Sequence, residues 1–70
     1  MTKAATTSYT KAQASKANDL FGMYSAVEGA SFEANRFQHD NWKFTVKMPH
    51  VTKHAIIGPR GGVVDVWNEY

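Results

Sequence analysis

Cysteine is absent from this sequence, and its absence excludes several kinds of protein at once. Without thiols the chain forms no disulfide, no thiolate zinc site and no iron–sulfur cluster, and it offers no cysteine nucleophile. At 70 residues it is also too short for a multidomain enzyme or an α/β fold that spans a cofactor. A chain of this size buries only about 60% of the surface that it exposes when unfolded, so its core is thin. These limits favour one small binding domain.

Long hydrophobic runs are missing as well. A signal peptide needs an apolar run of about 7–15 residues behind a basic start, whereas residues 1–19 consist mainly of Thr, Ser, Ala, Lys and Gln. No window approaches the roughly 18 apolar residues of a membrane-spanning helix. We therefore expect no membrane association and a cytoplasmic location, which is the host cytoplasm if the protein is viral. We expect residues 1–9 to form a flexible tail.

The excess of positive charge is also small, because eight Lys and Arg against six Asp and Glu leave a net charge of only +2. Residues 1–35 sum to zero, and residues 36–70 carry the whole excess together with all three histidines. An excess this small is no evidence for nucleic-acid binding. It does argue against an acidic mimic of nucleic acid.

An amphipathic helix is predicted over residues 11–28. Thr10 and Gln13 have the spacing of a capping box, in which each side chain binds the backbone N–H of the other residue. Gly29 suits the left-handed conformation that often ends a helix. Between these signals, apolar residues recur at helical spacing: Ala17, Leu20, Phe21, Tyr24 and Val27.

Alternation of apolar and polar residues predicts strands after the helix. The clearest strand covers 42–48, where four large apolar side chains alternate with polar ones before Pro49. Further strands are predicted over 51–57 and 63–67, the second with an extension to Tyr70 left open. The glycine-rich residues 58–62 connect these two strands as a hairpin.

Residues 31–38 fit either a strand or a continuation of the helix. The turn-forming sequence His-Asp-Asn at 39–41 precedes a clear strand, which favours the first alternative. The expected fold is α+β, with one N-terminal helix packed on a three- or four-stranded antiparallel meander. Residues 10–70 then form a single small domain.

No arrangement of catalytic or metal-binding residues stands out. His50 and His54 have the spacing of a zinc-binding helix, but in a predicted strand that spacing separates them by about 13 Å. The acidic residues are scattered, and no serine lies in a nucleophile elbow. The loop at 58–62 precedes a strand, whereas a phosphate-binding loop precedes a helix. We therefore expect no enzymatic activity, no metal and no cofactor.

The most informative feature is the sheet face that the helix leaves uncovered. If Phe44 faces the helix, then Lys43 and Lys47 face outward, and alternation in the last strand puts Val63, Asp65 and Trp67 outward as well. A solvent-directed tryptophan beside lysines exceeds what folding requires and indicates binding. A one-residue bulge after Gly62 would reverse this parity and place Trp67 in the core. Both alternatives are open at this stage.

Three hypotheses on function follow from this face. In the first, the chain is a non-enzymatic protein-binding module, a small regulator, adaptor or inhibitor of the size common in phages and plasmids. It docks through the outer sheet face and the 58–62 loop, with Trp67, Arg60 and Tyr70 as anchors.

In the second hypothesis the same face binds nucleic acid, with Trp67 stacking on a base and four cations contacting phosphates: Lys43, Lys47, Lys53 and Arg60. In the third, the chain is a subunit of a larger assembly. Open strand edges also permit a homodimer by edge pairing.

Overall fold

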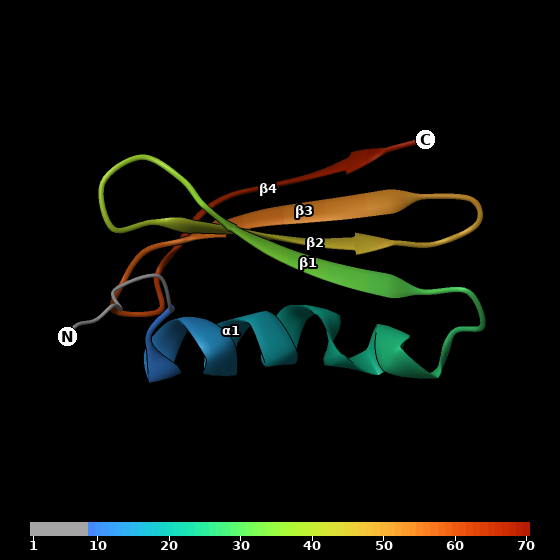
Figure 1. Ribbon diagram of the computed structural model, residues 1–70, viewed down its shortest axis with the longest axis horizontal. Helices are drawn as coiled ribbons and strands as arrows, with labels where there is room; N and C mark the ends of the chain where they lie inside the picture. The colour runs from blue at the N-terminus through green and yellow to red at the C-terminus, as the bar shows by residue number, and fades with distance from the viewer. Residues whose placement is uncertain (1–8) are drawn as a thin grey trace, which may run out of the picture.

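The computed structural model describes residues 9–70, which form one helix packed on an antiparallel sheet (Figure 1). The sheet has four strands in the order β1-β2-β3-β4, each antiparallel to its neighbour. This confirms the predicted α+β class and the meander. No helix within residues 9–70 combines the length and the apolar character needed to cross a membrane. The elements are α1 (Lys11–Phe21), a 3₁₀ helix η2 (Gly22–Ala26), β1 (Ser31–Arg36), β2 (Trp42–Lys47), β3 (Thr52–Ile57) and β4 (Val63–Glu69).

The start of α1 is the predicted capping box. The Thr10 hydroxyl accepts a hydrogen bond from the Gln13 backbone N–H at 3.1 Å, and Gln13 Oε1 accepts one from the Thr10 N–H at 2.8 Å. These bonds satisfy N–H groups that the first turn of a helix leaves without an intrahelical partner.

The end of the helix differs from the prediction. The α-helix stops at Phe21 instead of residue 28, and Gly22–Ala26 continue as a tighter 3₁₀ helix. Glycine lowers the stability of an α-helix by about 1 kcal/mol relative to alanine, so the turn at Gly22 changes type easily. Gly29 does adopt the expected positive φ, at 84°, but it turns the chain into β1 after the 3₁₀ helix has ended.

The strands lie where alternation predicted them, with small differences at the ends. β1 ends at Arg36 and β2 at Lys47, whereas β4 continues to Glu69. The segment at 31–38 is therefore a strand and not a continuation of the helix.

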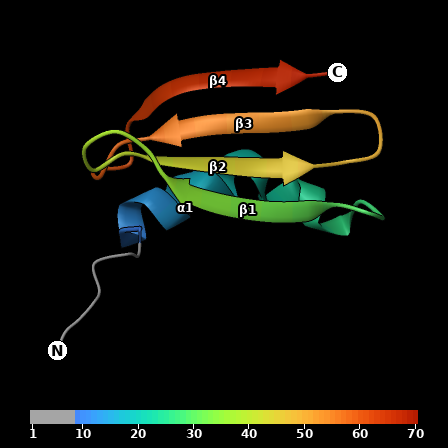
Figure 2. The ribbon, with the colours of Figure 1, turned by 45° about the horizontal axis from the view of Figure 1, so that its top comes forward.

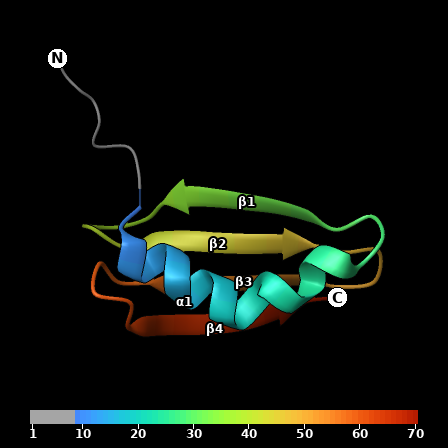
Figure 3. The same ribbon diagram turned by 90° about the horizontal axis from the view of Figure 1, so that it is seen from below.

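The core lies between α1 and the two central strands. Figure 2 shows α1 behind one face of the sheet, and Figure 3, which looks onto that face, shows α1 over the middle strands with β1 clear of it. The buried core side chains come from Phe21 of the helix and from β2 and β3: Phe44, Val46, Ala55 and Ile57. Apolar residues on the outer strands are much more exposed, such as Phe32 on β1 and Val66 on β4, each at 50%.

Tyr9 belongs to this packing and not to a tail. Its ring lies edge-on to Trp42 at 5.3 Å and to Phe44 at 5.2 Å between centroids. This corrects the expectation for residue 9, while the rest of the predicted tail, residues 1–8, lies outside the described residues.

The strand register determines which side chains of β4 point toward the helix and which point away from it. His54 is paired with Trp67 and also with Thr45, so these side chains lie on the face opposite to the Phe44–Ala55 pair. We call the sheet face opposite to α1 the outer face. Trp67 is on the outer face, as the alternation predicted.

A bulge in β4 corrects one part of that prediction. Ile57 is paired with Val63 and Ile56 with Asp65, so Val64 is an extra residue between the two pairs. Val63 therefore shares the helix-side face with Ile57 instead of pointing outward. Because the bulge comes before Asp65, it leaves the outward parity of the following residues unchanged.

Candidate functional site

The outer face carries a row of paired side chains that crosses all four strands. No helix or strand within residues 9–70 covers this face. At the β4 end of this row the indole of Trp67 stacks on the imidazole of His54, with ring centroids 4.9 Å apart and planes inclined by 19°. The row consists of Glu33, Thr45, His54 and Trp67.

His54 is held on both ring nitrogens. Its Nε2 lies 2.6 Å from Glu69 Oε1, and its Nδ1 lies 3.0 Å from the Thr45 hydroxyl. An ionised carboxylate only accepts hydrogen bonds, so Nε2–H donates to Glu69, and in the neutral ring Nδ1 accepts from Thr45. These two bonds and the stacked indole fix the imidazole in one orientation, which gives Trp67 a rigid base.

This hydrogen-bonded group lies in the buried part of the outer face. His54 is only 8% exposed and Thr45 only 3%. The order hydroxyl–imidazole–carboxylate is that of a catalytic triad, but the hydroxyl is buried inside the sheet face and presents no open nucleophile. The group holds the His54 ring in place beneath Trp67. No local sequence pattern indicates it, because Thr45 and Glu69 lie on different strands from His54.

Charges on the outer face are sorted by strand. Two lysines, Lys43 and Lys47, lie on β2, and two acids, Asp65 and Glu69, lie on β4. The register aligns them, because Lys43 and Asp65 are both paired with Ile56, and Lys47 and Glu69 with Thr52. A basic strand and an acidic edge therefore flank the strand that carries His54.

One of these lysines has an acidic partner on β1. Lys47 Nζ lies 2.9 Å from Glu33 Oε2, and both side chains are about half exposed. The hydrogen bond from Lys47, reinforced by the attraction of its charge, lowers the pKa of the Glu33 carboxyl below its ordinary value. The same contact raises the pKa of Lys47.

Replacing Glu33 by glutamine tests this pair. The lowered pKa means that the pair stabilises the fold above the unfolded-state pKa of Glu33, and that this contribution is lost as the pH falls through the lowered value. Since solvent screens both groups, the effect is small. We expect E33Q to have a slightly lower urea midpoint than wild type at neutral pH and the same midpoint in strong acid. Glu28→Gln, on exposed chain before β1, is the control, and a midpoint difference that does not change with pH would contradict the pairing.

The predicted anchors do not converge on one surface. Arg60 lies in the loop before β4 and Tyr70 follows β4, so the length of the strand, about 20 Å, separates them. Tyr70 is 95% exposed, and its hydroxyl accepts a hydrogen bond from the Asn68 side chain at 3.2 Å.

The 58–62 loop is tied to the start of α1. The Thr10 hydroxyl donates a hydrogen bond to the Pro59 carbonyl at 2.8 Å. A side chain on Gly61, which has φ 89°, would stand 3.2 Å from the Ala12 carbonyl oxygen. The loop therefore lies at the helix end of the molecule, although Arg60 itself is exposed.

Lys53 lies on the other face from Lys43 and Lys47. It is paired with Val46 and Asn68 on the helix side, where its ammonium lies 5.6 Å above the ring of Tyr24. The hypothesis that all of these lysines share the outer face with Trp67 is therefore wrong for Lys53. Lys53 directly precedes His54, and neighbouring residues in a strand point to opposite faces, so alternation alone predicts its position on the helix side.

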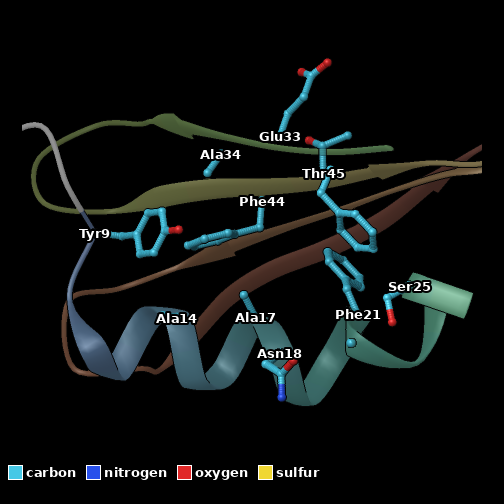
Figure 4. A pocket seen from close by; sticks show the side chains of 12 residues that line it. Tyr9, Ala14, Ala17, Asn18, Phe21, Ser25, Glu33, Ala34, Phe44 and Thr45 are labelled. Carbon is cyan, nitrogen blue, oxygen red and sulfur yellow. The ribbon is translucent and has the colours of Figure 1, made fainter. Parts of the chain in front are cut away.

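A groove with a volume of about 430 Å³ runs between α1 and β1 on the helix side. Its walls include Ala17 and Phe21 from the helix and Phe32 and Ala34 from the strand, and Tyr9 lies at one end (Figure 4). Figure 4 also shows that Glu33 and Thr45 point away from the helix, toward the outer face. The groove exists because α1 covers the central strands and leaves β1 bare.

Metal-ligating side chains do not gather within residues 9–70, where no group of three or more His, Asp or Glu could hold an ion. Comparisons of the chain with protein-family models, with curated proteins and with solved structures found no match.

Proposed function

We propose that this protein is a non-enzymatic protein-binding module that docks through the outer face of β2, β3 and β4. The observation that supports the proposal is the partly exposed Trp67 on the edge strand β4, held flat on the buried His54 in a face without a covering layer. Large aromatic side chains on a rigid support carry much of the binding energy in protein interfaces, because docking them costs little conformational entropy.

The charges around Trp67 favour a protein partner over nucleic acid. Asp65 and Glu69 precede and follow Trp67 on the same face of β4, and they repel a phosphate backbone. Lys47 is partly neutralised by Glu33, and Lys53 lies on the opposite face. A partner with its own mixture of acidic, basic and apolar groups fits this surface better.

The proposed surface is narrower than the one predicted from the sequence. It contains Trp67, Lys43 and Lys47, together with the acids of β4. Arg60 and Tyr70 remain predictions as anchors, because they lie beyond the two ends of β4 and outside the face that carries Trp67.

Affinity capture from a native cell lysate tests the proposal. The tagged wild-type chain is compared with Trp67→Ala, and Val66→Ala on the helix-side face of the same strand is the matched control. We expect Trp67→Ala to lower the recovery of specific partners by about tenfold or more, as loss of a large aromatic anchor does. Val66→Ala should recover them as wild type does.

Trp67→Phe separates binding from folding, because a phenyl ring still covers His54 but buries less area against a partner. It should show intermediate recovery with an unchanged circular dichroism spectrum. Equal recovery by the wild type and a folded Trp67→Ala variant would remove Trp67 from the interface and overturn the proposal.

A further inference from the structure

We propose that the partner on the outer face is a second copy of this chain, packed sheet against sheet with the helices outside. This inference rests on the proposed function, because it assigns an occupant to the same face. The observation behind it is that each lysine of β2 shares a register row with an acid of β4, across β3.

A two-fold axis that runs parallel to the strands above β3 brings every lysine of β2 opposite an acid of β4 in the other copy. Rotation about such an axis places β2 of one copy over β4 of the other and preserves the position along the strands. Lys43 then faces the partner's Asp65, and Lys47 faces the partner's Glu69. Symmetry repeats both contacts, so the interface contains four pairs of opposite charge. Aligned sheets cross at about 30°, and the flexible lysine stems span the resulting offset.

The same charges disfavour the other way of stacking the two faces. A two-fold axis perpendicular to the strands places β2 over β2 and β4 over β4. Lys43 then faces the partner's Lys47, and Asp65 faces the partner's Glu69, so every charged contact is between like charges. The pattern therefore selects one orientation of the dimer.

The middle of the face suits this orientation too. His54 and Ile56 lie beneath the axis, and because they are only 8% and 6% exposed they present little surface to their counterparts. Trp67 meets the partner's Thr45 and lies between the two lysines of the partner, where an indole face attracts ammonium groups. The patch extends about 10 Å from β2 to β4 and about 13 Å from Lys43 to Lys47. That is small for a specific interface, so we expect a weak dimer whose population depends on concentration.

Charge reversal with sedimentation velocity tests the proposal on the full chain. In the proposed dimer, position 43 of one copy faces position 65 of the other. Lys43→Glu therefore places two acids opposite each other, and Asp65→Lys places two lysines opposite each other, so each variant repels its own copy. We expect each reversal to raise the dimer dissociation constant by roughly 10- to 100-fold, because two contacts change sign. Lys11→Glu on the exposed start of the helix makes the same charge change away from the face and should leave the constant unchanged.

Mixing the two variants provides the decisive measurement. In a heterodimer of K43E and D65K, the introduced glutamate of one copy faces the introduced lysine of the other, and the native lysine and aspartate face each other in the second contact. We expect the mixture to dimerise about as tightly as wild type, while each variant alone is monomeric at the same concentration. Circular dichroism confirms that both variants fold.

Two results would overturn the inference. The first is a wild-type chain that stays monomeric up to the highest attainable concentration. The second is a wild-type dimer that tolerates both reversals, which identifies a different contact such as strand-edge pairing. If either occurs while Trp67→Ala still lowers the capture of other proteins about tenfold, a second copy on the outer face is excluded and the proposed function stands.

Discussion

Phe44→Ala is expected to leave the chain largely unfolded at room temperature. Phe44 is 7% exposed and packs in the core with Phe21 and with the edge of Tyr9. Truncating a buried phenylalanine costs about 3–5 kcal/mol, because apolar contacts are lost and a cavity remains. A domain of this size has only about 3–5 kcal/mol to lose. Circular dichroism and urea denaturation measure the folded fraction directly.

Phe32→Ala is the matched control for this experiment. Phe32 is the same residue type on the same sheet face, but it lies on the uncovered strand β1 and is 50% exposed. We expect it to cost no more than about 1 kcal/mol. Similar losses for the two variants would show that the core does not lie between α1 and the central strands.

The strands could be predicted from the sequence because their signal is local. In β2 the apolar side chains need to face one side only, so alternation marks both the strand and its buried face. The capping box at Thr10 and Gln13 is equally local. The length of the helix was less predictable, because Gly22 weakens the α-helix from within and 3₁₀ turns are frequent at helix ends.

The candidate site was predicted in part. The face to which a side chain points follows from alternation within its own strand, whereas its neighbours depend on how the strands pair. Trp67 was placed on the correct face from alternation alone. Its support by His54, and the link from His54 to Glu69, depend on the register of β3 and β4. A single bulged residue, Val64, alters that register, and composition does not reveal where a bulge falls.

The sorting of charge by strand also emerges only from the assembled sheet. Lys43 and Asp65 are far apart in the sequence, and each is an ordinary solvent-facing charge on its own strand. The meander brings both strands next to β3 and aligns the charges in rows. The complementarity of these rows to their own rotated copy is therefore a property of β2 and β4 together. Such complementary charges raise the rate of association and also fix the orientation of the two copies.

Gln13→Ala is expected to cost about 2–4 kcal/mol, although it removes a polar side chain. Gln13 is 1% exposed, and its Nε2 donates hydrogen bonds to the Asp40 carbonyl at 2.9 Å and to the Ile57 carbonyl at 3.0 Å. Together with the cap to Thr10, this one amide joins the start of α1 to the β1–β2 turn and to the end of β3. Removing it leaves two carbonyls and one N–H without these partners, and urea denaturation measures the loss.

Gln13→Glu distinguishes the donated bonds from simple packing, because the shape is kept while the amide becomes an acid. A carboxylate cannot donate to two carbonyls, whereas its protonated form can donate to one of them. The variant should therefore lose more stability, relative to wild type, in neutral than in mildly acidic solution. Gln38→Ala, at an exposed glutamine in the β1–β2 turn, is the control and should stay within about 0.5 kcal/mol of wild type. If Gln13→Ala is as stable as this control, the amide does not join the helix to the sheet.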